Sequence, residues 1–287
     1  MKVSVIIVSY NTLELTKACL ASLRRAGGEK EILVVDNAST DGSPKMIRDQ
    51  FPEVILIENE KNLGFGRANN VALARARGEY VIFLNPDTVV KSEAIEKAVT
   101  FMEHHPEVGI AGGRILNPDG SEQESISYRY PGEKYASGET KGLSGHIACV
   151  LGAFMIARKK ILDEIKGFDE DFFLYGEDED LCWRIREQGY EVGFIPEAEV
   201  YHWGGGSESA SSRPEVAVKK TLAEYLFYKK HYRPETLRRI YRRERWKARW
   251  RLITLGLSAL ALGKSPRHQE KVARYRLVLE MTKNPQE

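Results

Sequence analysis

Residues 3 to 10 read VSVIIVSY, an apolar run rich in β-branched side chains that ends in polar residues. Continuous apolar runs, unlike runs that alternate apolar and polar residues, are typical of strands that helices cover on both faces. Four further runs follow along the chain: EILVVDNA at 31 to 38, VILIENE at 54 to 60, YVIFLNPD at 80 to 87 and VGIAGGRIL at 108 to 116. Each run predicts a strand.

Helical patterns separate these strands. Residues 12 to 28 read TLELTKACLASLRRAGG, which places Leu13, Thr16 and Leu20 on one helical stripe and ends at a glycine pair. Strands that alternate with helices predict an α/β fold with a mostly parallel central sheet flanked by helices. In such sheets ligands bind beyond the carboxyl ends of the strands.

The residues that close the predicted strands are polar. Asp36 closes the second strand, residues 62 to 67 follow the third, and Asn85 and Asp87 close the fourth. We therefore expect one partly acidic edge of the sheet. A dinucleotide-binding fold would need a glycine-rich turn after the first strand, where this chain reads SYNTLE, and the sequence has no phosphate-binding loop of the Gly-Lys-Ser/Thr type.

A second acidic place lies far along the chain, in YGEDEDLCWR at 175 to 184, where Glu177 to Asp180 are four consecutive carboxylates. Such a cluster is unfavourable unless it faces water, a helix N-terminus or a cation. Asp87 and His202 supply further ligand types. Carboxylates, an imidazole and substrate phosphates together suit a divalent cation, Mg²⁺ or Mn²⁺, that is held mainly by its substrate.

Several segments stand in a fixed order along about residues 1 to 210. They are VSVIIVSYN, VVDNASTDGS, NLGFGRANN, FLNPDT, VLGAFMIAR, GFDEDFFLYGEDEDLCWR and YHWGGGS. Together they resemble family-2 glycosyltransferases of the GT-A fold, and the bacterial rhamnosyltransferase-like branch in particular. The resemblance implies a GT-A-like sheet and an inverting transfer of a sugar from a nucleotide diphosphate donor.

The resemblance also implies roles for residues on the donor side. Asp36 would accept a hydrogen bond from the pyrimidine ring, and Arg67 would contact phosphate or ribose. Asp87 would ligate the metal, with His202 as the other metal or diphosphate ligand. Asn85 stands where the family has the first aspartate of an Asp-x-Asp element, and because its amide is neutral it would contact ribose instead.

On the acceptor side the resemblance makes Asp178 the general base. Its carboxylate would take the proton of the acceptor hydroxyl as that oxygen attacks the anomeric carbon from the face opposite the leaving diphosphate. Inversion follows from that geometry. Glu177 and Asp180 would bind and orient the acceptor or the base, and neighbouring carboxylates would raise the pKa of Asp178.

The carboxylates also have plainer structural interpretations. The acidic cluster is typical of the first turn of a helix, with Asp178 as N-cap and Asp180 paired with Arg184 four residues on. Residues 85 to 87 are typical of a turn that closes a strand, and Asp36 of an Asx-type turn. These alternatives do not exclude the functional ones.

Other single residues also have both a structural and a functional interpretation. A lone histidine such as His202 is more often structural than a ligand, and Arg67 could be a solvated helix residue. Cys19, Cys149 and Cys182 are odd in number and fit no paired metal spacing, so we expect buried thiols.

The chain of 287 residues divides by charge near position 213. Residues 213–287 hold 20 Lys and Arg against 7 Asp and Glu, whereas the remainder holds 23 against 34. We expect a catalytic domain over 1–212 and a basic helical segment over 213–287. No apolar run approaches the roughly 20 residues of a membrane-spanning helix, and the apolar start lacks a cleavage site, so we expect a cytoplasmic protein.

The basic segment also carries apolar residues at helical spacing: Trp246, Trp250, Ile253, Leu257 and Leu260. A basic helix with an apolar stripe is typical of the surface of an anionic membrane, which would make the protein peripheral on the inner face. Packing on the catalytic domain, or on a second subunit of a homodimer, is equally open. Nucleic-acid binding is not expected, because the first 212 residues are net acidic and no recognition motif occurs.

These inferences predict an inverting, metal-dependent hexosyltransferase. Its donor would be a dTDP- or UDP-sugar, with rhamnose the first choice, and its acceptor a saccharide or lipid-linked saccharide. The alternative is a catalytically silent protein of the same fold that binds nucleotide sugars or polyanions. Residues 117 to 145, rich in Gly, Ser, Pro and charge, are expected to form a long loop or lid that chooses the acceptor.

Overall fold

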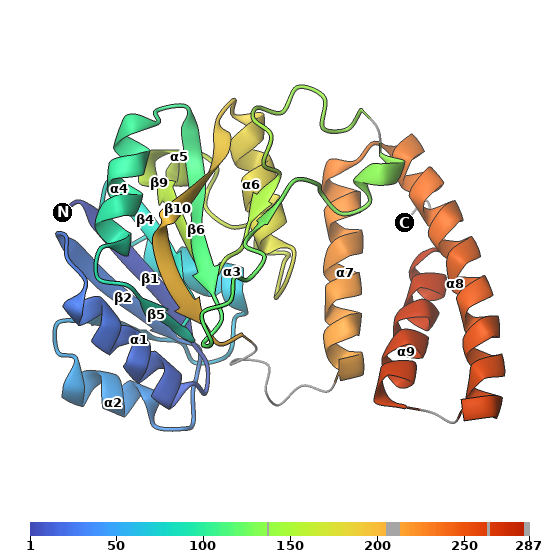
Figure 1. The fold of residues 1–287 in the computed structure, drawn as a ribbon, viewed down its shortest axis with the longest axis horizontal. Helices are drawn as coiled ribbons and strands as arrows, with labels where there is room; N and C mark the ends of the chain where they lie inside the picture. The colour runs from blue at the N-terminus through green and yellow to red at the C-terminus, as the bar shows by residue number, and fades with distance from the viewer. Residues whose placement is uncertain (137, 205–212, 263–264, 284–287) are drawn as a thin grey trace. The chain divides into compact units, whose positions relative to one another are not determined.

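The computed structural model describes residues 1–136, 138–204, 213–262 and 265–283. The chain forms two compact units (Figure 1). The α/β unit comprises residues 1–129, 142–173 and 177–209, and the helical unit comprises residues 130–141, 174–176 and 210–287. Two short segments from the first two thirds of the chain therefore belong with the C-terminal helices.

Four strands form the parallel half of the sheet in the α/β unit. They pair in the order β3, β2, β1, β4, so their carboxyl ends lie at one edge. The strands are β1 Val3–Ser9, β2 Lys30–Asp36, β3 Ile55–Glu58 and β4 Tyr80–Leu84, and the helices that follow the first three are α1 Leu13–Arg25, α2 Ser43–Gln50 and α3 Phe65–Leu73. All four strands predicted here are confirmed.

The other half of the sheet is mixed. Within the described residues it completes eight strands, with β9 antiparallel between β4 and β6, β10 parallel to β6, and β5 antiparallel at the edge. These strands are β5 Thr88–Val90, β6 Val108–Leu116, β9 Phe154–Arg158 and β10 Glu191–His202. The predicted mostly parallel sheet is confirmed. Because β5 and β9 run in reverse, their first residues share an edge with the carboxyl ends of the others.

Both faces of the sheet are buried. Val5 and Ile7 of β1 belong to one apolar cluster with α1, α2 and α4, whereas Ile6 and Val8 belong to another with α3, α5 and α6. The helices not yet located are α4 Ala94–His104, α5 Lys159–Glu164 and α6 Glu177–Glu187. Helices on both faces explain the continuous apolar runs, since each fully buried Val or Ile side chain stabilises the fold by about 1.5–3 kcal/mol.

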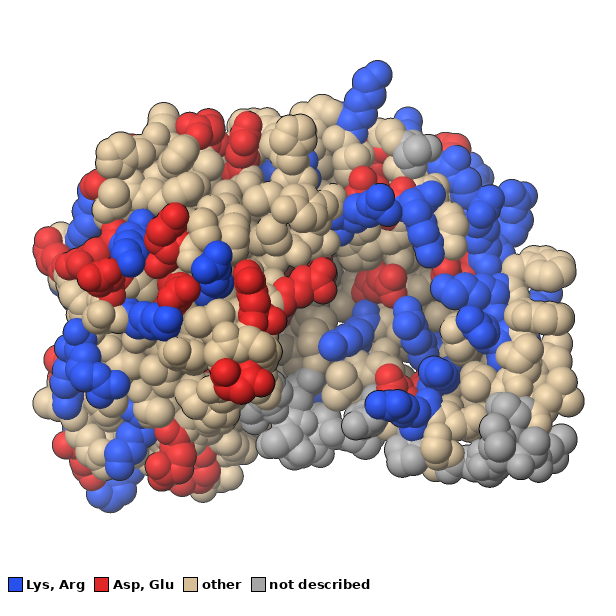
Figure 2. Space-filling model, viewed as in Figure 1, with Lys and Arg blue, Asp and Glu red and all other residues tan. Residues whose placement is uncertain are grey.

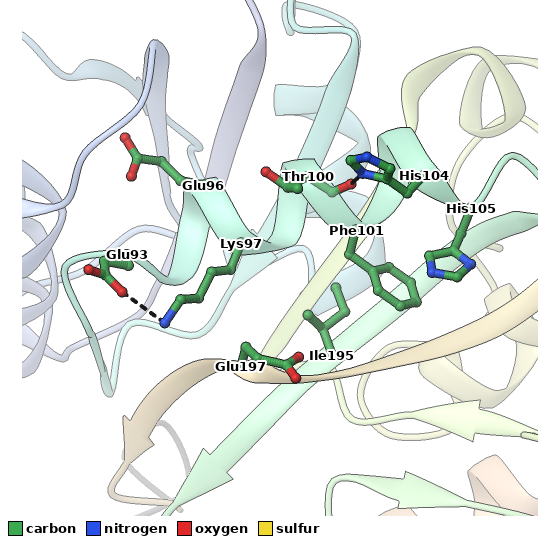
Figure 3. Close-up of a pocket in the computed structure, with 9 residues that line it drawn as sticks. All are labelled: Glu93, Glu96, Lys97, Thr100, Phe101, His104, His105, Ile195 and Glu197. Carbon is green, nitrogen blue, oxygen red and sulfur yellow. Dashed lines mark hydrogen bonds and ion pairs between the residues drawn. The ribbon is translucent and has the colours of Figure 1, made fainter.

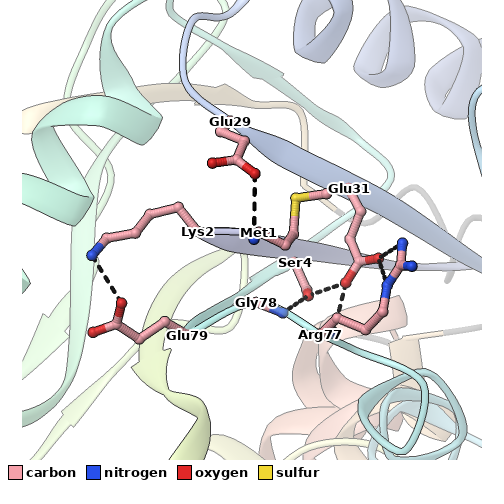
Figure 4. Close-up of polar contacts among 8 residues, drawn as sticks. All are labelled: Met1, Lys2, Ser4, Glu29, Glu31, Arg77, Gly78 and Glu79. Atoms are coloured by element: carbon pink, nitrogen blue, oxygen red, sulfur yellow. Dashed lines mark hydrogen bonds and ion pairs between the residues drawn. The ribbon is translucent and has the colours of Figure 1, made fainter.

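A buried carboxylate joins the segments at the amino ends of the strands (Figure 4). Glu31 accepts hydrogen bonds from the Ser4 hydroxyl at 2.6 Å, the Arg77 backbone N–H at 2.7 Å and the Arg77 guanidinium. Burial works to raise the pKa of Glu31, but these hydrogen bonds and the charge of Arg77 hold it below its usual range. Glu31 lies at the amino end of β2, whereas Asp36 lies at its carboxyl end. We therefore assign Glu31 a role in the stability of the fold.

The helical unit has an aromatic centre. Its described helices are α7 Arg213–His231, α8 Pro234–Leu262 and α9 Pro266–Met281, and α9 packs on the other two. Tyr225, Phe227 and Tyr228 are almost fully buried, and Tyr232 Oη donates to the Pro131 carbonyl at 2.6 Å. The predicted helical C-terminal segment is confirmed.

Residues 117 to 145 contain little regular structure, as predicted. They include β7 Ile126–Ser127, which pairs with β8 Cys149–Val150, and a short 3₁₀ turn at Glu133–Tyr135. The three cysteines are buried and form no disulfide, also as predicted. Over the described parts of the chain, no helix is long and apolar enough to cross a membrane.

Candidate active site

The loops that follow β1, β2 and β3 are joined by hydrogen bonds at the carboxyl edge. The Asn11 backbone N–H donates to Ser39 Oγ at 2.9 Å, and Asn37 Nδ2 donates to the Gly64 carbonyl at 3.0 Å. Asn11 and Ala38 both adopt positive φ, 52° and 65°, which is unfavourable for residues with a side chain. Strained backbone held by a polar network is typical of a pre-organised binding edge.

Asp36 lies at the end of β2 and is 1% exposed. Its Oδ2 accepts a hydrogen bond from the Ser39 backbone N–H at 2.8 Å, which is the turn-type contact that the sequence left open. Its Oδ1 is buried and has no hydrogen-bond partner among the described residues. A buried oxygen without a partner costs free energy, so this atom is suited to accept a hydrogen bond from a ligand.

Asp87 and His202 are brought together by two antiparallel strands. β5 and β10 pair Thr88 with His202, which sets His202 Nε2 3.3 Å from Asp87 Oδ1, with both residues less than a tenth exposed. His202 Nδ1 lies 3.0 Å from Gln123 Oε1, and Gln123 Nε2 donates to the His202 carbonyl at 2.7 Å. Gln123 therefore fixes the orientation of the ring, and Nε2 is the ring nitrogen turned toward Asp87.

This pair is an incomplete metal shell by itself. Among the described residues no group of three or more His, Cys, Asp or Glu could hold a metal ion. A carboxylate and an imidazole nevertheless supply ligand types that Mn²⁺ and Mg²⁺ accept when phosphate oxygens complete the shell. The two residues fit a cation that arrives with a diphosphate.

Asn85 lies just beyond β4 and is partly exposed. Its backbone N–H donates to the Ala153 carbonyl at 3.1 Å, and its own carbonyl accepts from Thr88 Oγ1 at 2.7 Å. These backbone contacts connect the end of β4 to the start of β9 and to β5. The turn expected at residues 85 to 87 is therefore present.

Asp178 lies in the first turn of α6, next to the chain that leads into β9. Its Oδ2 accepts from the Gly152 backbone N–H at 2.8 Å, and its Oδ1 is buried without a partner among the described residues. A Cβ on Gly152 would lie only 2.6 Å from Asp178 Oδ1, so only glycine leaves room for this carboxylate. Burial, and next the charge of Glu179, raises the pKa of Asp178 to about 7.

Glu177 is 6% exposed, and its Oε2 is buried without a hydrogen-bond partner in the described structure. Burial first, and then the charge of Asp178, raises the pKa of Glu177 well above its usual range. Two adjacent carboxyl groups whose ionised forms are both disfavoured are typical of catalytic sites rather than of ordinary helix ends.

Asp180 has a different environment from its neighbours. It is 0% exposed and forms an ion pair with Arg184 Nη2 at 2.7 Å, while Arg184 Nη1 also donates to the Gly167 carbonyl at 2.8 Å. The i,i+4 pair considered from the sequence is confirmed. The interpretation of Asp178 as N-cap is wrong, because α6 already begins at Glu177.

Arg67 projects from α3 toward the loop before α6. Its Nε donates to the Glu170 carbonyl at 2.8 Å, and the Glu170 carboxylate lies 3.8 Å away. The side chain is half exposed, so other N–H groups of the guanidinium can still donate to a ligand. The structure places Arg67 at the same edge as the loop that follows β3, without a contact to Asp36 or Asp87.

The model of the family described as "Glycosyl transferase family 2" matches residues 4–166, more than half of the chain. The chain belongs to glycosyl transferase family 2. The matched span contains Asp36, Arg67, Asn85 and Asp87, whereas the carboxylates of α6 and His202 lie beyond it.

Relatives of this family 2 chain include enzymes with stated substrates. It is 28% identical over 229 residues to an N-acetylglucosaminyl-diphospho-decaprenol L-rhamnosyltransferase of Mycobacterium tuberculosis, covering 69% of this chain and 75% of that protein. It is 27% identical over 236 residues to the uncharacterised protein y4gI of Sinorhizobium fredii, covering 76% of this chain. The chain spans only 26% of the length of y4gI.

The fold has solved counterparts. The mannosyltransferase PcManGT from Pyrobaculum calidifontis, solved with GDP-Man and Mn²⁺, matches with a TM-score of 0.61 at 20% identity, covering 98% of this chain and 86% of that one. The GT-A-like fold expected of a family 2 member is confirmed.

Two contacts at the candidate site of this family 2 chain were not predicted from the sequence. Gln123 holds His202 although it lies in the 117 to 145 loop, where no sequence pattern marks it. Gly152 holds Asp178 from 26 residues away. The signal for Gly152 was a single glycine beside a strand, which often marks a close approach of backbone to another group.

A separate groove of about 460 Å³ runs along α4 in this family 2 chain (Figure 3). Its lining includes the Glu93–Lys97 ion pair, Phe101 and His104, and it contains none of the residues predicted for the site. It lies between the exposed face of α4 and residues Ile195 and Glu197 of β10, apart from the predicted site, so we assign it no role.

Proposed function

We propose that this protein is an inverting glycosyltransferase that moves a sugar from a nucleotide diphosphate to a hydroxyl acceptor. The observation that carries the proposal is Asp178, whose carboxylate is held by Gly152, whose other oxygen is buried without a hydrogen bond to the described part of the chain, and whose pKa is raised to about 7. A base with a pKa near the working pH can both accept a proton and remain ionised. Family membership supports the same reaction class.

Asp36 is proposed to recognise the base of the donor. Its unpaired Oδ1 is an acceptor that matches the ring N–H of a pyrimidine such as uracil or thymine. Asn85 and Arg67 are proposed to contact the ribose and the phosphates. A dTDP- or UDP-sugar remains the proposed donor, with rhamnose first, which the stated activity of the Mycobacterium tuberculosis relative supports.

Asp87 and His202 would hold Mg²⁺ or Mn²⁺, and Gln123 would keep the imidazole turned toward it. Such an ion supplies positive charge that stabilises the leaving diphosphate. PcManGT, which shares the fold, was solved with Mn²⁺.

In the proposed reaction Asp178 takes the proton of the acceptor hydroxyl. The acceptor oxygen forms a bond to the anomeric carbon while the bond from that carbon to the diphosphate oxygen breaks, which inverts the configuration. Positioned proton transfer contributes roughly 10²–10⁴-fold to the rate. Glu177 is proposed to orient the acceptor, and Asp180 to orient the base indirectly, by anchoring α6 through Arg184.

The acceptor is proposed to be a saccharide or a lipid-linked saccharide, chosen by residues 117 to 145. A lipid-linked sugar appears in the stated activity of the Mycobacterium tuberculosis relative. Peripheral attachment to the inner face of the membrane and assembly into a homodimer are further proposals at this level, and the surface that bears on them is described below.

The test is Asp178→Asn, assayed with nucleotide sugars and Mg²⁺ or Mn²⁺. We expect turnover to fall by at least about 10²-fold while the donor still raises the melting temperature, because the amide keeps the shape but cannot take the proton. Glu187→Gln, at the exposed end of the same helix, is the matched control and should keep full activity. Full turnover in Asp178→Asn would refute the role of Asp178. Donor binding by the wild type without transfer or hydrolysis would support the silent binding protein.

A further inference from the structure

The outward side of α8 is apolar. On the inward side Ile240 and Ala248 are 0% exposed. The opposite side carries large apolar residues that are 59–72% exposed, namely Trp246, Trp250, Ile253 and Leu257. Steps of three and four residues place them on one line along the helix, which we call the α8 stripe. Leu260, the last residue of the stripe predicted from sequence, lies outside the residues whose side chains are described.

Basic side chains flank the α8 stripe on both sides. At about 100° per residue, Arg242 and Arg249 fall on one flank, and Arg243 and Lys247 on the other. Arg242 and Arg249 are exposed and form no ion pair with any described residue. Figure 2 shows Lys and Arg gathered over the helical unit on the face in view.

The α8 stripe and its flanks expose two kinds of surface, one apolar and one positively charged. Large apolar side chains in contact with water favour an apolar partner, and unpaired arginines favour an anionic one. We propose that the α8 stripe docks the protein on a membrane that contains anionic lipid. Tryptophan rings lie at the level of the headgroups in such a membrane, and long arginine side chains reach the lipid phosphates.

A second copy of the chain fits this face less well. In a two-fold contact each face meets itself, so the arginine flanks would face each other. The acidic residues of α8 could not neutralise them, because Glu235 and Glu244 already contact Arg238 and Lys247 on their own helix. Like charges at a contact disfavour association, whereas anionic lipid removes the repulsion.

The geometry also indicates how the helix would lie. The stripe from Trp246 to Leu257 is about 16 Å long at 1.5 Å per residue and parallel to the helix axis. The inward side packs in the helical unit, and no described helix can cross a membrane. The helix would therefore lie in the plane of the interface, with one face immersed.

The experiment is vesicle flotation of the full chain without donor or acceptor. Vesicles of phosphatidylcholine alone are compared with vesicles that also contain phosphatidylglycerol, and we expect strong binding only to the second. Trp246→Ser with Trp250→Ser should weaken it roughly tenfold or more. Arg242→Gln and Arg249→Gln together should weaken it on the order of 25-fold, at roughly fivefold per charge.

Controls come from the other helices. Leu222→Ser on α7 and Arg267→Gln with Lys271→Gln on α9 change an exposed apolar residue and two exposed basic residues away from the stripe, and should keep wild-type binding. All altered side chains are exposed, so circular dichroism and the melting temperature should stay unchanged.

The proposal is overturned if the wild type does not float with anionic vesicles, or if the tryptophan variant floats as the wild type does. It is equally overturned if sedimentation velocity shows a dimer that the tryptophan variant abolishes, or if single-stranded DNA binds while vesicles do not. Because no nucleotide sugar is present, failure of the proposed transfer reaction would leave the flotation result unaffected.

Discussion

At the scale of single residues, the carboxylates of the candidate site differ in whether each oxygen has a hydrogen-bond partner. Asp36 and Asp178 each have one oxygen fixed by a backbone N–H and one buried oxygen that no described residue meets with a hydrogen bond. Asp180, two residues from Asp178, forms an ion pair with Arg184 through Oδ2. The same residue type in one cluster therefore has different environments, and the difference comes from hydrogen-bond partners rather than from sequence.

The transfer rate is expected to fall below about pH 7. A general base acts only when it is deprotonated, and burial followed by the charge of Glu179 raises the pKa of Asp178 to about 7. With saturating substrates the rate should rise about tenfold per pH unit below this value and level off above it. Steady-state turnover measured between about pH 5 and pH 9 checks this.

Glu179→Gln is the diagnostic variant for that profile. Removing the neighbouring charge should lower the pKa of Asp178 and move the acidic limb to lower pH, whereas Glu187→Gln should leave the limb in place. Because the carboxyl groups of the cluster titrate together, the limb reports the set. An acidic limb that does not move in Glu179→Gln would point to a different base.

Gly152→Ala should separate catalysis from stability. The new Cβ would lie 2.6 Å from Asp178 Oδ1, and the carboxylate, as the end of a side chain, would turn away. We expect turnover to drop on the order of 10²-fold with little change in melting temperature, since small displacements of a catalytic group have effects of that size. Gly27→Ala, whose Cβ would meet Glu96 Oε1 at 2.5 Å far from the site, is the control. Equal turnover in both variants would contradict the placement of Asp178.

Sequence could name the chemical groups of the site and the local Asp180–Arg184 pair, but not the partners that lie far along the chain. Asp36, Asp87 and His202 follow strand ends or stand in motifs, so their positions are readable. The contacts of Gly152 with Asp178 and of Gln123 with His202 join residues 26 and 79 positions apart. Such contacts depend on which strands become neighbours, and that information is absent from local patterns.

At the scale of elements, α6 carries Asp178, the proposed base. Arg184 pairs with Asp180 and donates to the Ile165 and Gly167 carbonyls, which fixes the helix to the loop that precedes it. Asp180→Asn should lower the free energy of unfolding by about 3 kcal/mol, because it leaves a largely buried arginine unpaired. Urea unfolding followed by circular dichroism measures this.

The control for α6 is a pair of the same spacing on the surface. Asp163→Asn breaks the exposed Lys159–Asp163 pair of α5 and should cost less than about 0.5 kcal/mol. Similar losses in Asp163→Asn and Asp180→Asn would mean that Asp180 does not anchor the helix.

Elements were predictable where one segment contains its own signal. The runs at 3 to 10 and 108 to 116 became β1 and β6 almost residue for residue. The antiparallel strands β5 and β9 were not predicted, because the pattern of a short buried apolar run does not indicate the direction of a strand in the sheet. These two strands bring Asn85 beside Ala153 and Thr88 beside His202, so the missed elements are also the ones that assemble the site.

At the scale of the whole molecule, the charge is divided along the chain. Residues 213–287 are strongly basic, whereas the remainder is net acidic, although the total is only +2. Exposed charges such as those flanking the α8 stripe act through solvent and are screened by salt. Asp36 is buried, and hydrogen bonds to a buried group are screened much less.

Salt should therefore separate the two proposed activities. Raising the ionic strength from about 0.1 M to about 1 M shortens the Debye length from about 10 Å to about 3 Å, so flotation with anionic vesicles should be largely lost. Asp36→Asn, which replaces one acceptor oxygen by an amide, should reduce the shift in melting temperature that a UDP- or dTDP-sugar produces, equally at both salt concentrations. If vesicle binding persists at high salt, the arginines are not what holds the protein there. If the donor shift in Asp36→Asn equals that of the wild type, Asp36 does not bind the base.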